Sequence, residues 1–94
     1  MDPLRTGLTA ERSLLVTEQH TAAQWGSGGV QVLSTPHMVA LMEGSAVDAV
    51  DPLLPAGQQT VGTAVQIEHL AATPIGGRVT ARATLVAVEG RRLR

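Results

Sequence analysis

The sequence predicts an α+β domain in which an antiparallel sheet wraps around one central helix. Three observations lead to this prediction: one long stretch with helical periodicity at residues 34–52, a short apolar run before it, and alternating apolar and polar residues after it. A helix that must bury an apolar stripe, followed by a meander of strands, is the element order of such a domain. The length of 94 residues predicts a single domain spanning residues 1–94.

The central helix is predicted from its ends and its periodicity. Thr35 is a suitable N-cap and Pro36 suits the first helical position. Pro52 ends the helix, because the residue before a proline is pushed out of the helical region. Glu43 interrupts the apolar spacing, so its carboxylate is expected to project from the apolar stripe. The residues expected to form that stripe are Val39, Met42, Ala46, Ala49 and Val50.

One strand is expected before the helix and one after it. A short strand is predicted within Leu8–Thr17, and the clearest strand of the sequence covers Thr60–His69. In Thr60–His69 alternate residues share one face, as in a half-buried strand, and His69 is the last residue of the apolar face.

The end of the sequence predicts further strands. Arg78–Val88 alternates in the same way and is expected to pair antiparallel with Thr60–His69. In this second strand the residues expected to face inward are Val79, Ala81, Ala83, Leu85 and Ala87. Glu89–Gly90 is typical of a tight turn, and Arg91–Arg94 is the expected start of a third strand.

Composition excludes several classes of function. A formal net charge of -1 provides neither a basic field for nucleic acid nor a polybasic stretch for a membrane. The absence of cysteine excludes disulfides and thiolate metal sites, and the apolar runs are too short to span a bilayer. Met1–Arg5 lacks a charged-then-apolar signal segment, which favours a cytoplasmic protein. A chain of this size buries only about 60–65% of its unfolded surface, so association with a partner is expected.

Cofactor and metal sites are not expected. The glycine-rich residues 26–29 precede the helix, but the Lys-Ser/Thr signature of a phosphate loop is absent and no dinucleotide glycine pattern follows. His20 and His37 have no partners at ligand spacing. We therefore predict neither a cofactor nor a metal ion.

Four blocks of the sequence resemble the hotdog-fold thioesterases related to fluoroacetyl-CoA thioesterase. They are Leu33–Glu43, Thr60–Ala64, His69–Pro74 and Val88–Leu93, in the family's order and at compatible spacing. The resemblance covers nearly the whole chain. It implies the hotdog fold, with an antiparallel sheet wrapped around one central helix. Because the family continues for about two more strands, it also implies that C-terminal strands are missing here and that the chain is C-terminally truncated.

The resemblance also implies a function. It indicates a hydrolase that cleaves the thioester of an acyl-CoA and works as a homodimer or higher homo-oligomer. The family's catalytic set falls on Thr35, Glu43 and His69, and Gly62 takes the position whose backbone helps to hold the substrate. Residues 22–32 lack the lid phenylalanines of the fluoroacetate-specific enzyme and offer only Trp25. A short or small acyl group is therefore expected, rather than fluoroacetate.

The chemistry of these residue types agrees with the implied function. A desolvated Glu43 would be a stronger base or nucleophile, and His69 can exchange protons near neutral pH. Thr35 places its hydroxyl and the free N–H groups of the helix start where an oxyanion would be stabilised. Each residue also has a structural interpretation, as a solvated glutamate, a hydrogen-bonded histidine and an N-cap. Two other functions stay open: a non-catalytic acyl-CoA-binding module, and an inactive truncated fragment.

Overall fold

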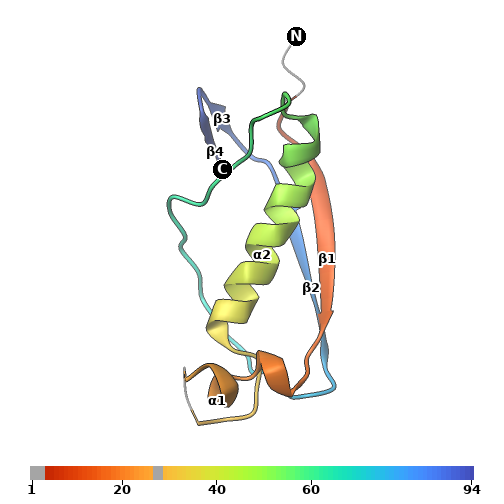
Figure 1. Ribbon diagram of the computed structural model, residues 1–94, viewed down its shortest axis with the longest axis vertical. Coiled ribbons are helices and arrows are strands. Elements are labelled where there is room, and N and C mark those ends of the chain that lie inside the picture. Colours follow the sequence, from red (N-terminus) through yellow and green to blue (C-terminus); the bar gives the residue numbers. More distant parts are fainter. Residues whose placement is uncertain (1–3, 27–28) are drawn as a thin grey trace.

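The centre of the fold is helix α2, Thr35–Val50, which lies against a sheet of two strands (Figure 1). The computed structural model describes residues 4–26 and 29–94. The two strands are β1, Thr9–Leu15, and β2, Arg78–Thr84, and they pair antiparallel over all 7 residues of each. The α+β architecture with one long helix and antiparallel strands is therefore confirmed.

The start of α2 differs from the sequence prediction by one residue. Ser34, not Thr35, is the N-cap, because Ser34 has extended backbone angles and its hydroxyl oxygen accepts from the backbone N–H of His37 at 3.2 Å. Thr35 is the first helical residue, and its side chain is thereby released from the capping role. At the other end, Pro52 lies in a 3₁₀ turn, η2, Asp51–Leu53, that follows the last residue of α2 as predicted.

The face of α2 that packs on the sheet is not the predicted stripe. Ser45, Ala49 and Val50 are buried, whereas Met42 is 45% exposed and Ala46 is exposed. Because successive residues are about 100° apart around a helix, the side of α2 that carries Glu43 lies nearly opposite to that of Ser45. Only the last part of the predicted stripe is correct, because the sheet contacts α2 from the side of Ser45.

The buried apolar cluster lies at the C-terminal end of α2. Its buried members are Ala49, Val50 and Leu85, and the partly buried residues packed against them are Leu4, Leu8, Ala10, Val88 and Leu93. Most of these residues lie at one end of the sheet, where β1 begins and β2 ends, or in the chain next to it. The N-terminal half of α2 is outside this cluster, so other contacts must hold it in place.

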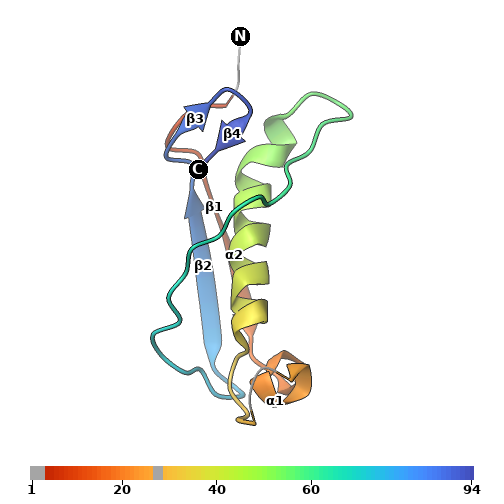
Figure 2. The ribbon, with the colours of Figure 1, turned by 90° about the vertical axis from the view of Figure 1, so that its left-hand side faces the viewer.

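The predicted strand Thr60–His69 is not formed. Residues 58–70 are irregular; Figure 1 shows them on the other side of α2 from β1 and β2, and Figure 2 shows that they cross in front of α2 and continue beside β2. The expected pairing with Arg78–Val88 is also wrong: β2 pairs with β1 along one of its edges, and the described residues 58–70 form no backbone ladder with its other edge. Within the described residues the segment is anchored near its start, where Thr60 Oγ1 donates to Asp51 Oδ1 at 2.6 Å. We call residues 58–72 the return segment.

The last predicted elements are confirmed, with shorter bounds. β2 ends at Thr84, and its inward and outward residues alternate as expected, with Ala81 and Leu85 buried. A small hairpin follows, formed by β3, Val88–Glu89, and β4, Arg92–Leu93. Gly90 lies in its turn with φ of 62°, a conformation that favours glycine.

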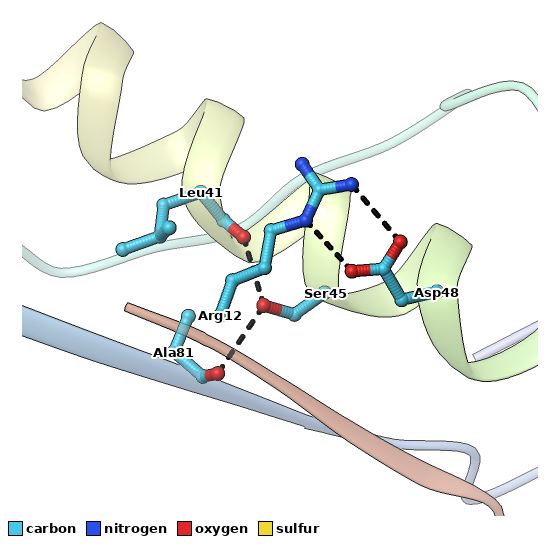
Figure 3. Close-up of polar contacts among 5 residues, drawn as sticks. All are labelled: Arg12, Leu41, Ser45, Asp48 and Ala81. Carbon is cyan, nitrogen blue, oxygen red and sulfur yellow. Dashed lines mark hydrogen bonds and ion pairs between the residues drawn. The ribbon is translucent and has the colours of Figure 1, made fainter. Parts of the chain in front are cut away.

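A polar clamp connects β1 to the middle of α2. Arg12 donates two hydrogen bonds to Asp48, from Nε to Oδ2 at 2.7 Å and from Nη2 to Oδ1 at 2.9 Å (Figure 3). The guanidinium crosses the helix at Gly44, where a Cβ would lie 2.7 Å from Arg12 Cζ. The side chains of Arg12 and Asp48 are 49% and 40% exposed. We call this the Arg12–Asp48 clamp.

The energetics of the clamp are close to neutral. An ion pair this exposed contributes little to the free energy of unfolding, because solvent screens it. Glycine in a helix interior costs about 0.5–1 kcal/mol relative to alanine. Since Gly44 is needed to accommodate Arg12, the two effects nearly cancel. The clamp therefore adds little net stability to the fold.

Candidate functional site

The candidate site lies between α2 and the return segment. Thr35, at the start of α2, and His69, near the end of the return segment, approach each other so that Thr35 Oγ1 lies 2.8 Å from His69 Nδ1. Either atom can be the donor, depending on the histidine tautomer. When the hydroxyl donates, the imidazole carries its proton on Nε2. In either tautomer Nδ1 is engaged with Thr35, so Nε2 is the ring nitrogen that remains available for proton transfer.

A second contact of the site joins Glu43 to Gly62. A Cβ built on Gly62 would lie 2.9 Å from Glu43 Oε1, so the carboxylate rests against the Gly62 backbone. Glycine is the residue that allows this approach without moving the Glu43 side chain. The structure thus brings the predicted site residues together as two pairs along one surface.

The two pairs are separated along the helix. Thr35 and Glu43 are eight residues apart, which corresponds to about 12 Å along the axis. Side chains on a helix tilt toward its N-terminus, so Glu43 leans toward Thr35. A small ligand bound between the two pairs would therefore lie within reach of side chains from both pairs.

The expected desolvation of Glu43 is wrong for this chain. Glu43 is exposed, because the return segment covers that side of α2 only in part. The expectation of several free N–H groups at the helix start is also only partly met. Pro36 has no N–H and the N–H of His37 is bonded to Ser34 Oγ, so within the first three helical residues Thr35 offers the remaining backbone donor.

A small hollow adjoins His69. Its volume is about 230 Å³, and it is lined by Val32, His69, Leu70, Ala71 and Ala72. This is below the roughly 300–1,000 Å³ of most small-molecule sites. The hollow has room for a small apolar group beside the imidazole.

Sequence reasoning missed a cluster of rings at the other side of the helix start. The ring centroids of His20 and His37 lie 5.0 Å apart, and those of Trp25 and His37 lie 4.5 Å apart, both pairs edge to face. Trp25 ends α1, Ala22–Trp25, and its Nε1 donates to the carbonyl oxygen of Gln19 at 2.8 Å. The rings line a hollow of about 630 Å³ together with Gln19 and Gln24. No spacing in the sequence predicts this cluster, since it depends on how the chain folds back before α2.

The electrostatics of this cluster are set by burial. Partial burial, and then the nearby charge of His20, lower the pKa of His37 below its ordinary value. His37 Nδ1 lies 2.9 Å from the hydroxyl of Ser34, so the imidazole also contacts the N-cap.

No group of three or more potential metal ligands occurs among the described residues. The lid region extends into residues 27–28, which lie outside the described part of the chain.

The arrangement of helix and strands is found in solved thioesterases. A crystal structure of a single-residue mutant of the fluoroacetyl-CoA-specific thioesterase FlK, in complex with fluoroacetate and CoA, matches with a TM-score of 0.88 and 36% identity over 96% of this chain and 77% of that chain. A hypothetical protein of Thermus thermophilus, described as a thioesterase superfamily member, matches with a TM-score of 0.87 and 32% identity over 99% of this chain and 69% of that chain. The chain therefore has the hotdog fold of the thioesterase superfamily.

The family within that superfamily follows from the sequence comparison. A family model described as fluoroacetyl-CoA-specific thioesterase matches residues 16–94. The fluoroacetyl-CoA thioesterase of Streptantibioticus cattleyicolor is 49% identical over 63 residues, which are 67% of this chain and 45% of that relative. The chain belongs to the fluoroacetyl-CoA-specific thioesterase family, and its match spans less than half of the length of that relative. Among the described residues no helix is long and apolar enough to cross a membrane.

Proposed function

We propose that the chain acts as an acyl-CoA thioesterase on a short or small acyl group. Family membership supports the reaction class. The hollow beside His69, of about 230 Å³, is open to solvent and offers a place for a small acyl group next to the imidazole. The lid phenylalanines expected for fluoroacetate specificity are absent, since the chain contains no phenylalanine.

The observation that carries this proposal is the way the return segment meets α2. His69 reaches Thr35 at 2.8 Å, and Gly62 lies against Glu43 on the same segment. Four residues that are dispersed in the sequence thus line one surface. A carboxylate, a histidine oriented by a hydroxyl and nearby backbone donors are the groups that thioester hydrolysis needs.

In the proposed reaction Glu43 acts as the general base. Its carboxylate takes a proton from water as the water oxygen bonds to the carbonyl carbon of the thioester. Backbone N–H groups at Gly62 and Thr35 then face the oxyanion. The carbon–sulfur bond breaks, and the thiolate of CoA receives the Nε2 proton of His69 in its doubly protonated form, whose Nδ1–H donates to Thr35 Oγ1. The proton that Glu43 took from water then returns to His69, which restores the carboxylate, and the products are a carboxylic acid and CoA.

We further propose that the active form is a homodimer or a higher homo-oligomer. In the described chain Glu43 is exposed and the return segment has no strand partner. A second copy covering this side of α2 would desolvate Glu43, which strengthens a carboxylate as a base.

One observation favours the alternative of a non-catalytic acyl-CoA-binding module. The separation of about 12 Å between Thr35 and Glu43 is large for groups that act on one carbonyl. A binding module would hold acyl-CoA tightly and release no thiol.

The proposal is tested by measuring released thiol across acyl-CoAs of increasing acyl length. We expect kcat/KM to be highest for acyl groups of two to about four carbons and to fall as the chain outgrows the hollow. Tight binding of acyl-CoA without thiol release would instead identify a binding module. A maximum at long acyl chains would contradict the assigned substrate class.

A further inference from the structure

The half of α2 that carries the candidate site lies outside the buried apolar cluster, and its apolar side chains Met38, Val39 and Leu41 are only partly buried. That cluster is centred on Ala49, Val50 and Leu85, beyond the C-terminal side of Glu43. Where α2 crosses β2, the buried side chains are small, as at Ser45 and Ala81. Small side chains make a smooth interface that does not interlock, so packing alone fixes the rotation of α2 poorly.

Polar contacts add the directional restraint on α2 that the packing of small side chains does not provide. The single hydroxyl proton of Ser45 is shared between the carbonyl oxygens of Leu41, at 3.0 Å from Oγ, and Ala81, at 3.2 Å, which joins the buried side of α2 to β2 (Figure 3). The Arg12–Asp48 clamp joins the flank of α2 to β1 through two hydrogen bonds, at 2.7 and 2.9 Å. A planar guanidinium that binds both carboxylate oxygens fixes direction as well as distance. Together these contacts define the angle at which α2 sits on the sheet.

That angle determines where the Glu43 carboxylate lies. Side chains extend about 5–6 Å from a helix axis, so a rotation of about 10° displaces them by about 1 Å. A misplacement of about 1 Å at a reacting centre can reduce the rate about 100-fold. Gly44 follows Glu43 directly and is the point where the Arg12 guanidinium crosses the helix. The clamp therefore acts on the turn of α2 that presents Glu43.

We propose that Arg12 is a positioning residue: through Asp48 and across Gly44 it sets the rotation of α2 and thereby aims Glu43 at Gly62 and the substrate. This inference rests on the proposed function of Glu43. It also explains why α2 carries a glycine in its interior although the clamp adds little net stability.

The first test removes the clamp and keeps the bulk of the side chain. Arg12→Met should lower kcat about tenfold or more with KM unchanged, because the lost alignment matters only in the transition state. Arg82→Met is the matched control. Arg82 also pairs with a carboxylate, through Nε to Glu11 Oε1 at 2.6 Å, but from the sheet face away from α2. This control should keep the parental kcat, and an equal loss in both variants would overturn the proposal.

The second test separates positioning from stability. Gly44→Ala improves helix propensity, yet its Cβ would occupy the place of the Arg12 guanidinium. Positioning predicts a melting temperature at or above that of the parent together with a kcat reduced about tenfold. A purely structural role predicts parental kcat at equal or higher stability, which would overturn the proposal.

A third readout does not depend on activity. In two-dimensional NMR spectra of the chain, Arg12→Met should shift the backbone amide signals of Glu43 and Gly62, whereas Arg82→Met should leave them in place. If the parent releases no thiol from any acyl-CoA, the proposed function fails while this readout still tests the clamp. Unchanged Glu43 and Gly62 signals in Arg12→Met would overturn the positioning role.

Discussion

Ser34 and Thr35 are neighbours with separate tasks. Ser34 is fully buried and caps α2, whereas Thr35 is exposed and contacts His69. The sequence predicted the helix start to within one residue but gave both tasks to Thr35, because serine and threonine are similarly good N-caps. Only the structure distinguishes which hydroxyl is free for chemistry.

This separation predicts two different mutant phenotypes. Ser34→Ala should lower the free energy of unfolding by about 1 kcal/mol, the usual cost of losing an N-cap. Thr35→Ala should lower stability less and activity more, since its hydroxyl bonds to His69 rather than to the helix. Thermal melts and thiol release measured on both variants check this. Equal stability losses with parental activity in Thr35→Ala would contradict the division.

His37 predicts a pH dependence at the start of α2. Partial burial, and secondarily the charge of His20, lower the pKa of His37 below its ordinary value of 6.5. The folded state thus favours the neutral imidazole, so its contribution to stability is present above pH 6.5 and is lost as pH falls through the lowered folded-state pKa.

NMR titration of the imidazole Cε1 proton measures this pKa. His20→Gln removes the neighbouring charge at similar size and should raise the pKa of His37 only part of the way to 6.5, because burial is the larger cause. A full return to 6.5 would show that burial contributes nothing.

Among the elements, those specified by local signals were predicted best. Thr35 and Pro36 predicted the start of α2 to within one residue and Pro52 its end, and Gly90 marks the β3–β4 turn. The strand Thr60–His69 failed because alternation shows that a segment suits a sheet, but not that a neighbour is present to pair with it. The predicted apolar stripe of α2 was wrong for a similar reason, since which face is buried depends on where β1 and β2, distant in sequence, contact the helix.

The Arg12–Asp48 clamp predicts an acid-sensitive connection. Hydrogen bonds from Arg12, aided by its charge and opposed by burial, hold the pKa of Asp48 below its ordinary value of 3.8. The clamp's contribution to stability is therefore present above pH 3.8 and is lost as pH falls through the lowered folded-state pKa.

In Arg12→Met the pKa of Asp48 should rise, because both effects of Arg12 that lower it are lost, and acid unfolding should become less steep. Carboxyl ¹³C titration and acid melts measure the two effects. An Asp48 pKa that does not change in Arg12→Met would show that the two hydrogen bonds do not persist in solution.

The whole molecule is extended for its size. Its radius of gyration is 15.1 Å, against about 13 Å for a compact domain of about 100 residues. Its accessible surface is 6680 Å², against about 5,200 Å² for a compact 9.8 kDa monomer. The excess is comparable to the surface that a partner buries in a stable interface, about 800 Å² or more. Exposed apolar side chains lie on the return segment, where Val61 is 75% and Val65 is 55% exposed.

The chain is therefore expected to self-associate through the side of α2 that carries the return segment. Sedimentation velocity should show concentration-dependent association, and the melting temperature should rise with protein concentration. Val61→Glu and Val65→Glu should weaken association, whereas Val86→Glu, a comparably exposed control at 65% exposure, should not. A single monomeric species with a concentration-independent melting temperature would contradict this expectation.

More of the candidate site than of the surrounding fold was predicted from the sequence. Thr35, Glu43, His69 and Gly62 were all named from a family resemblance, and the structure brings them into two contacting pairs. Their exposure could not be predicted, because it depends on what covers the return segment. The His20, Trp25 and His37 cluster was missed because nothing local in the sequence indicates it.

The most direct test of the account is thiol release from a short acyl-CoA by the parent chain and by Glu43→Gln. The exchange keeps the shape of the side chain and removes its charge at an exposed position, so the melting temperature should not change. If Glu43 is the general base, hydrolysis should fall by about 100-fold or more while acyl-CoA binding persists. Hydrolysis at the parental rate by a folded Glu43→Gln variant would contradict the central claim.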